Sequence, residues 1–175
     1  MAQEAKLLPI VLRTEAKPVG LTGTGQGLAR RRKALAKARL RVLEFSAEAL
    51  HREPLTRLHF LFIAGLPKRR AAALAAEARA AGVLVNVEDE PELCDFYMPA
   101  VIRRGDLLIS VSTSGKSPGL AKLIRHWIER RLGLEWGGRV AELASDRHQW
   151  RGAGITPDIV SQKTAALVAE RGWLP

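Results

Sequence analysis

Residues 86–118 hold the side chains of this chain that are best suited to chemistry. The stretch begins at the end of a short apolar run, 83–87, which is typical of a strand, and four carboxylates follow closely: Glu88, Asp89, Glu90 and Glu92. A second apolar run at 107–111 predicts a buried strand, and it leads into a hydroxyl-rich turn with Ser112, Thr113, Ser114 and Lys116. Carboxylates can exchange protons with a bound ligand, so the stretch is a candidate site.

The turn after residue 111 ends at a well-marked helix start. Ser117 can cap the free N–H groups, Pro118 suits the first helical position, and apolar residues then recur at helical spacing up to Leu132. Backbone N–H groups and the helix dipole converge at such a turn, which makes it a candidate anion cradle. The same pattern also describes an ordinary capped turn.

A second candidate anion site lies near the beginning of the chain. A short strand at 18–22 leads into the glycine turn 23–27, and a basic helical stretch follows at 29–40. A strand, a glycine turn and a helix open a dinucleotide-binding unit, in which glycine lets the backbone approach a pyrophosphate. The third glycine position of the usual pattern is occupied here by Leu28. Arg30 and Arg31, in the first helical turn, are the basic residues best placed to meet a phosphate, and the other basic side chains are expected on a solvated face.

Two acids, one near the end of the next strand and one just after it, are candidates for binding a ribose. The strand is expected at 41–45, and Glu44 lies about 20 residues after the first glycine, where an acid often contacts an adenosine ribose. Glu48, just beyond the strand, is the alternative.

The remaining pattern predicts an α/β protein with a Rossmann-like, doubly wound parallel sheet. Strands expected at 58–64 and 83–87 flank an alanine-rich helix at 69–81, which Gly82 ends. A ligand of such a sheet binds at the carboxyl ends of the strands, where the glycine turn and Asp89 both emerge. A further helix is expected at 156–171, and it carries no assigned chemistry.

Composition points to an anionic partner and a reducing compartment. The net charge is +10, but aromatic residues make up only 5%, which disfavours single-stranded nucleic acid. The single cysteine, Cys94, cannot form an internal disulfide, and we expect it to be buried in a cytoplasmic protein. We expect no membrane partner, because the chain lacks a signal peptide and a sufficiently long apolar run. The four histidines are scattered, so no bound metal is expected.

Several long motifs resemble one known family. They are the lead-in LPIVL, the turn GTGQGLARR, and the stretch NVEDEPELCDFYMPAVIRRGDLLISVSTSGKSPGLAKLIRHWIE. Together they are similar to the precorrin-2 dehydrogenase and sirohydrochlorin ferrochelatase family, the module that also forms the N-terminal part of siroheme synthase. The resemblance covers most of residues 7–135.

The resemblance implies an enzyme of siroheme biosynthesis. Members of the family use NAD to oxidise precorrin-2 to sirohydrochlorin, and many then insert ferrous iron, which is a substrate. They work as homodimers. The resemblance further implies a Rossmann NAD-binding domain at 1–98, a dimerisation segment at 99–135 and a helical C-terminal region at 136–175.

The resemblance also implies roles for individual residues. Asp89 matches the catalytic aspartate, which would accept protons during oxidation and during iron insertion. Its acidic neighbours would raise its proton affinity; alternatively, Asp89 only forms a turn among surface charges. The implied cofactor-binding residues are Gly23, Gly25, Gln26, Gly27, Ala47 and Glu48. The implied substrate-binding residues are Asn86, Ser112, Thr113, Ser114 and Lys116.

Two departures from the family pattern keep other functions open. Only about a dozen residues separate the second and third strands, and residues 65–68 replace a Thr-Asp pair that relatives tend to carry. One alternative is therefore a chelatase or tetrapyrrole-binding relative without dehydrogenase activity. The other, supported by net charge alone, is a basic Rossmann-like module that binds nucleic acid or regulates a partner.

Overall fold

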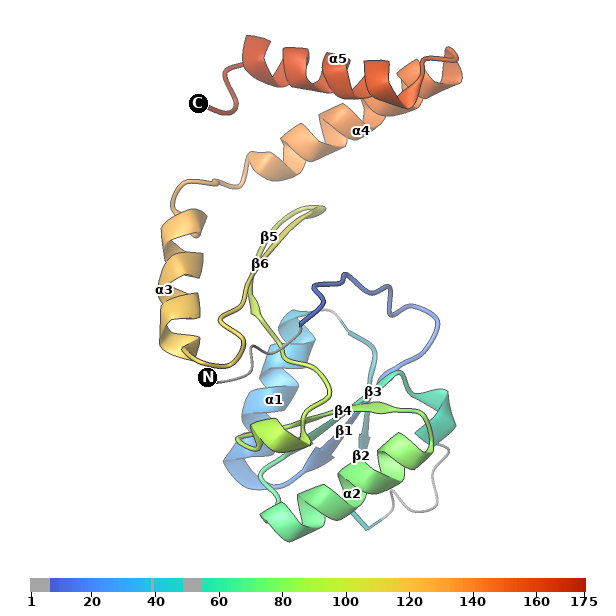
Figure 1. Cartoon of the computed structure of the whole chain (residues 1–175), viewed down its shortest axis with the longest axis vertical. Coiled ribbons are helices and arrows are strands. Elements are labelled where there is room, and N and C mark those ends of the chain that lie inside the picture. Colours follow the sequence, from blue (N-terminus) through green and yellow to red (C-terminus); the bar gives the residue numbers. More distant parts are fainter. Residues whose placement is uncertain (1–6, 39, 49–54) are drawn as a thin grey trace, which may run out of the picture. The chain divides into compact units, whose positions relative to one another are not determined.

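The structure is a computed structural model that describes residues 7–38, 40–48 and 55–175. The chain divides into two compact units, Met1–Met98 and Pro99–Pro175 (Figure 1). Among the helices of the described ranges, none is both long and apolar enough to cross a membrane.

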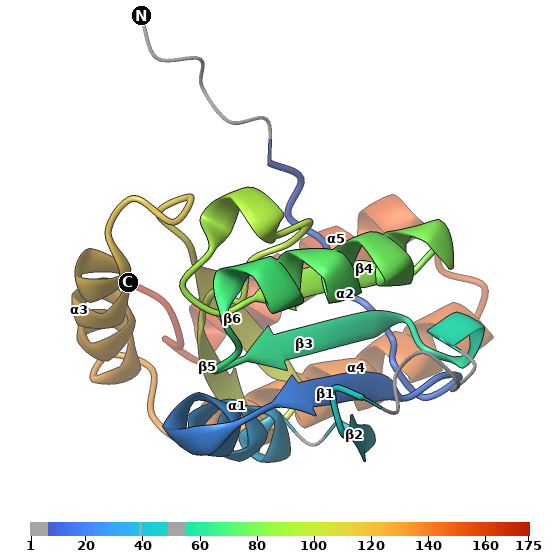
Figure 2. The same ribbon diagram turned by 90° about the horizontal axis from the view of Figure 1, so that it is seen from below.

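The first unit is a four-stranded parallel sheet between two helices. The strands lie in the order β2-β1-β3-β4, and Leu21 of β1 is paired with Glu44 of β2 and with Phe62 of β3. Figure 2 shows α1 and α2 on opposite sides of β1 and β3. The elements are β1 (Val19–Gly23), α1 (Gly25–Lys37), β2 (Val42–Phe45), β3 (Phe60–Ala64), α2 (Lys68–Ala80) and β4 (Leu84–Val87), with two short 3-10 helices, η2 (Leu55–Arg57) and η3 (Pro91–Leu93). The predicted α/β class and the parallel sheet are confirmed.

Successive side chains of each strand point to opposite faces of this sheet, and apolar side chains form a core on each face. On the α2 face, Leu61 and Ile63 of β3 pack with Leu74 and with the alanines of α2, whose small side chains let the helix lie close to the strands. On the α1 face, Phe62 packs with Leu21 and with Leu35 of α1. Helices on both faces explain why the strands read as nearly continuous apolar runs.

The strand order brings three strand ends to one edge of the sheet. β1 pairs with β2 on one side and with β3 on the other, so the carboxyl ends of β1, β3 and β4 lie beside one another. From β1 the chain adds β2 on one side of the sheet, and it then adds β3 and β4 on the other side. Doubly wound sheets bind ligands at the point where the order of strands changes in this way. The glycine turn, the loop after β3 and the acidic group after β4 all leave from this edge.

The second unit combines a hairpin with three helices. Strand β6 (Leu107–Val111) confirms the strand predicted there, although its residues are mostly half-buried, and it pairs antiparallel with β5 (Ala100–Arg104). Strand β5 is not among the strands that the sequence predicts. Helix α3 (Pro118–Glu129) begins as predicted, because the Ser117 hydroxyl accepts a hydrogen bond from the Leu120 N–H group at 3.4 Å. Two more helices follow, α4 (Trp136–Gly152) and α5 (Pro157–Glu170).

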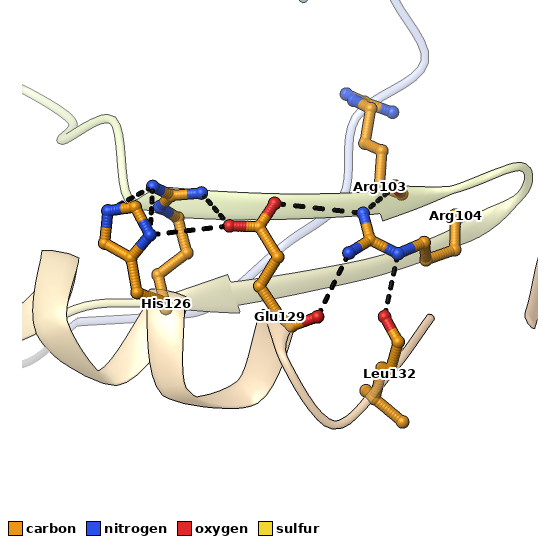
Figure 3. A network of polar contacts seen from close by, with 6 residues as sticks. Arg103, Arg104, His126, Glu129 and Leu132 are labelled. Carbon is orange, nitrogen blue, oxygen red and sulfur yellow. Dashed lines mark hydrogen bonds and ion pairs between the residues drawn. The ribbon is translucent and has the colours of Figure 1, made fainter. Parts of the chain in front are cut away.

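A polar network joins the hairpin to the end of α3 (Figure 3). The Arg104 guanidinium donates to the Leu132 carbonyl oxygen at 2.8 Å and to the Glu129 carbonyl oxygen at 3.3 Å. The Glu129 carboxylate in turn lies 2.6 Å from the Arg125 guanidinium and 3.7 Å from the His126 ring. A cation among the last carbonyl groups of a helix offsets the helix dipole, so Arg104 fixes β5 to this helix end.

We expect Arg104→Lys to lower the free energy of unfolding of the full chain by about 1–3 kcal/mol. Lysine keeps the charge, but it cannot reach both carbonyl groups with one planar fork, and the Arg104 side chain is only 12% exposed. Urea unfolding followed by circular dichroism measures the loss. The neighbouring Arg103, which is exposed, provides the control: Arg103→Lys should change the unfolding midpoint little, and equal effects of the two substitutions would contradict the role of Arg104.

Candidate functional site

The turn after β1 holds two strands unusually close together. Gly23 has φ +149°, and a Cβ atom at this position would overlap the carbonyl oxygen of Ala64, the last residue of β3. The N–H group of Thr24 donates to the same oxygen at 3.1 Å. Glycine is therefore required where the chain passes from β1 into the turn.

The first turn of α1 has no side chain that caps it. Thr24 precedes the helix, but its hydroxyl donates to the Gly65 carbonyl oxygen at 2.7 Å and accepts no hydrogen bond from the helix. A Cβ atom at Gly25 would meet no described atom within 4 Å, so the backbone is open there. Free N–H groups at an open helix N-terminus favour an anionic ligand, and this geometry fits the diphosphate of a dinucleotide.

In the usual GxGxxG pattern the third glycine lets the helix pack closely on the sheet, and here Gly27 has this role. It is buried in α1, and a Cβ atom there would lie 2.9 Å from the Gly65 nitrogen, with the Glu88 carboxylate closer still. Leu28, at the expected third position, instead packs against the core on the α1 face. The bulky residue therefore does not prevent the helix from approaching the sheet.

Glu88 lies inside this site and is not a surface charge. Its N–H group donates to the Ile63 carbonyl oxygen at 2.9 Å, which continues the pairing of β4 with β3 by one residue. Its side chain is only 15% exposed and reaches back to Gly27, and its carboxylate lies 3.5 Å from the Arg30 guanidinium. Arg30 thus meets a carboxylate of the protein at the place where the sequence suggested a phosphate.

Asp89 occupies a strained backbone position at the same edge. Its φ is +61°, and of the described residues other than glycine only Asp89 and Ser114 have positive φ. The left-handed region disfavours most side chains, but Asp and Asn tolerate it because their short polar groups bond locally. The Asp89 side chain is exposed. Asp89 therefore lies exposed just after β4, one residue beyond Glu88, whose carboxylate reaches Gly27 of the glycine turn.

The other two acids of the group bind one lysine. Lys68, the first residue of α2, lies 2.7 Å from a Glu90 oxygen and also contacts Glu92. The hydrogen bond from Lys68 lowers the pKa of Glu92 to about 2, and the two carboxylates raise the pKa of Lys68. Together with the pair between Glu88 and Arg30, each of the three acidic neighbours of Asp89 is offset by a cation.

We expect Lys68→Gln to flatten the acid limb of the stability profile. The folded pKa of Glu92 is lowered from 4.5 to about 2, so its pair contributes stability above pH 4.5 that is lost as pH falls through about 2. Without Lys68 the largest cause of the lowered pKa is gone, so Glu92 takes up less proton on unfolding. Urea midpoints measured between pH 6 and pH 2 test the prediction, and an unchanged slope would contradict it. The effect should be small, because these side chains are exposed.

The arginines that follow Arg30 also have partners in the protein. The Arg31 guanidinium lies 5.4 Å from the centre of the Phe62 ring, and burial lowers the pKa of Arg31 while Glu88 opposes the shift. Arg32 donates to both carboxylate oxygens of Glu44 at 2.8 and 2.6 Å. Arg32 remains exposed in this contact, as are Lys33 and Lys37, so the solvated face predicted for the basic residues after Arg31 is confirmed for these three.

The pairing of Glu44 bears on the choice between the two ribose candidates. Glu44 is bound by a bidentate contact on α1, whereas Glu48 is exposed beyond the carboxyl end of β2. The neighbouring Ala47 is buried, and its carbonyl oxygen accepts a hydrogen bond from Arg70 at 2.7 Å. The geometry favours Glu48 as the acid that a ligand would meet.

Asn86 and Cys94 hold the loop that carries Asp89. The Asn86 side chain is buried, and its amide donates to the Phe96 carbonyl oxygen at 2.9 Å. The Cys94 sulfur accepts a hydrogen bond from the Val87 N–H group at 3.2 Å, and burial raises the pKa of the thiol. Asn86 is thus placed to support the loop rather than to reach a ligand in solvent.

The hydroxyl-rich turn of the second unit is built by its own side chains. The Ser112 hydroxyl accepts from the Ser114 N–H group at 3.2 Å, and the Thr113 hydroxyl accepts from the Ser117 N–H group at 3.1 Å. Ser114 has φ +54°, and both Ser114 and Lys116 are exposed. Thr113 therefore shapes the turn, while Ser114 and Lys116 are available to a ligand.

No group of three or more His, Cys, Asp or Glu side chains within the described ranges is arranged to hold a metal ion. His51 lies outside those ranges.

Comparisons with known proteins identify the family and the fold. Residues 10–100 match a family described as putative NAD(P)-binding, and residues 104–131 match one described as the central part of sirohaem biosynthesis proteins. Among solved structures, the chain is similar to SirC, a precorrin-2 dehydrogenase, with a TM-score of 0.68 over 93% of this chain and 89% of that chain. With 17% sequence identity, this likeness establishes the fold.

Curated relatives are longer than this chain. Siroheme synthase of Methylococcus capsulatus is 38% identical over 158 residues, which are 79% of this chain and 33% of that protein. Siroheme synthase 2 of Aeromonas salmonicida is 32% identical over 197 residues, covering 95% of this chain and 40% of the relative. The chain thus spans between a third and two fifths of these relatives.

The match to the first family covers more than half of the 175 residues, and the second match begins at residue 104, shortly after the first ends at residue 100. The protein therefore belongs to the putative NAD(P)-binding family, among the members related to siroheme synthase.

Proposed function

We propose that this protein is an NAD-dependent dehydrogenase that oxidises precorrin-2 to sirohydrochlorin. The observation that carries the proposal is one edge of the parallel sheet, from which both the uncapped N-terminus of α1, after β1, and Asp89, after β4, emerge, with β3 between the two strands. The family match and the siroheme synthase relatives support the choice of cofactor and substrate.

The dinucleotide would be held by the turn after β1 and by the end of β2. The residues that we assign to it are Gly23, Gly25, Gln26, Gly27, Ala47 and Glu48. When bound, NAD supplies the acceptor for the hydride that leaves the substrate. We assign to Asp89 the proton that leaves with it, because a carboxylate can act as a general base and Asp89 is exposed after β4.

The charge of the chain suits a polycarboxylate substrate. The net charge is +10, and precorrin-2 carries many carboxylates, so association should be fast at low salt and slower at high salt. We assign Ser112, Thr113, Ser114 and Lys116 to the substrate as a group, with Asn86 supporting the Asp89 loop. Lys116 supplies the positive charge in this set.

The proposal includes a homodimer in the cytoplasm. Helix α3 exposes Leu120, Leu123 and Trp127 at helical spacing, with 49%, 68% and 50% of each residue accessible. An apolar stripe of this kind on a helix beside a two-stranded hairpin supports burial against a second copy. The single free thiol is consistent with a reducing compartment.

Insertion of ferrous iron into sirohydrochlorin is a second candidate activity. Metallation requires removal of pyrrole N–H protons, which is the same task that we assign to Asp89. Iron would then be a substrate held mainly by the macrocycle.

An anaerobic assay tests the proposal and separates its alternatives. Precorrin-2 and NAD are supplied to the protein, NADH is followed by its absorbance, and ferrous iron is then added. Formation of NADH supports the dehydrogenase. If siroheme forms only from supplied sirohydrochlorin, the protein is a chelatase and not a dehydrogenase. If neither reaction occurs and the protein binds DNA, it is a nucleic-acid-binding module.

A further inference from the structure

Glu88 presents a negative charge at the place where the proposed cofactor carries its own. The Glu88 carboxylate lies against Gly27 in the first turn of α1, and a Cβ atom at Gly27 would already collide with it. The same turn has no side-chain cap and is open above Gly25. The electrostatic features that attract a diphosphate therefore also hold this carboxylate.

Two contacts, one of the backbone and one of the side chain, hold Glu88 in this position. The backbone of Glu88 is fixed by its hydrogen bond to Ile63 at 2.9 Å, which extends β4. Its carboxylate is 3.5 Å from the Arg30 guanidinium, and only 15% of its side chain is exposed. A partly buried charge is weakly screened by salt, so it acts strongly on another anion a few ångströms away.

We propose that Glu88 is an internal competitor for the dinucleotide site, which must release the first turn of α1 and Arg30 before the diphosphate of NAD binds. This inference rests on the proposed use of NAD. The bound diphosphate would replace the carboxylate beside Arg30, and the charge of Glu88 would lower the affinity for the cofactor in its oxidised and reduced forms alike.

The test is the affinity of the full chain for NAD, measured by isothermal titration calorimetry. Glu88→Gln keeps the size of the side chain and removes its charge, and we expect it to bind NAD at least about tenfold more tightly than the wild type. Glu92→Gln provides a matched control, since it removes one acid from the same loop at an exposed position on Lys68. We expect this control to bind NAD within about twofold of the wild type.

A second variant separates charge from shape. Glu88→Asp keeps the charge but withdraws it by one methylene group, so its affinity should lie between those of the wild type and Glu88→Gln. If Asp and Gln increase the affinity equally, the length of the side chain matters and its charge does not, and the proposal is overturned. Circular dichroism melting checks that each variant is folded.

Each outcome of the NAD titration either supports or overturns the proposed role of Glu88. Tighter binding by Glu88→Gln, including binding where the wild type shows none, supports the inference. Equal or weaker binding by this variant, with a wild type that binds NAD, overturns the inference and leaves the proposed cofactor intact. If neither protein binds NAD, the barrier is not Glu88, and the proposed function fails together with the inference.

Discussion

Asp89→Asn should reduce the rate of NADH formation from precorrin-2 at least about 100-fold, because an amide cannot accept the proton that leaves the substrate. The affinity for NAD should stay within about twofold, since Asp89 is assigned to proton transfer and not to the dinucleotide. Asparagine is the informative replacement at this position. It tolerates φ +61° as aspartate does, whereas alanine would add backbone strain to the loss of the carboxylate.

The neighbouring acid provides the control for this experiment. Glu90→Gln makes the same change in net charge one residue away, where the carboxylate lies 2.7 Å from Lys68. We expect its rate of NADH formation to remain within a few-fold of the wild type. An equal loss in both variants would mean that the charge of the loop matters and that Asp89 has no special role.

Gly27→Ala should weaken NAD binding at least about tenfold and lower the free energy of unfolding by about 1–3 kcal/mol. The added methyl group would lie 2.9 Å from the Gly65 nitrogen and 3.1 Å from its Cα atom, and backbone atoms cannot rotate away as a side chain can. Helix α1 would have to move from the sheet, which displaces the N–H groups that face the ligand. Calorimetric titration and urea unfolding measure the two effects.

Gly119 provides a matched glycine for comparison. It also lies in the first turn of a helix, α3, but a Cβ atom there meets nothing within 4 Å. Gly119→Ala should therefore leave NAD binding unchanged and stabilise the protein by up to about 1 kcal/mol. If Gly27→Ala were as well tolerated as Gly119→Ala, the close packing at the glycine turn would not matter.

Elements with strong local patterns could be predicted from the sequence. The four parallel strands are apolar runs, and the capped start of α3 follows from Ser117 and Pro118, so their physical causes are local. Strand β5 was harder to predict, because two of its five residues are arginines and it follows a proline. Helix α4 contains three glycines and has no buried residue, so it lacks the apolar stripe that marks a helix.

The site could be predicted only to the level of its loops. The glycine turn and the acidic group were expected to meet because parallel strands end at one edge. The approach of Glu88 to Gly27, and of Arg32 to Glu44, depends on side chains reaching across the sheet or from a helix to a strand. No local spacing encodes such contacts, so Glu88 could not be distinguished from a solvated acid.

The most direct measurement is the stoichiometry of one anaerobic turnover. Wild-type protein, a limiting amount of precorrin-2 and excess NAD are mixed, and NADH and sirohydrochlorin are quantified by their absorbance. Our account predicts one NADH for each sirohydrochlorin, and neither product when Asp89 is replaced by Asn. Sirohydrochlorin that accumulates without NADH, or equal yields from the wild type and the Asn variant, would contradict it.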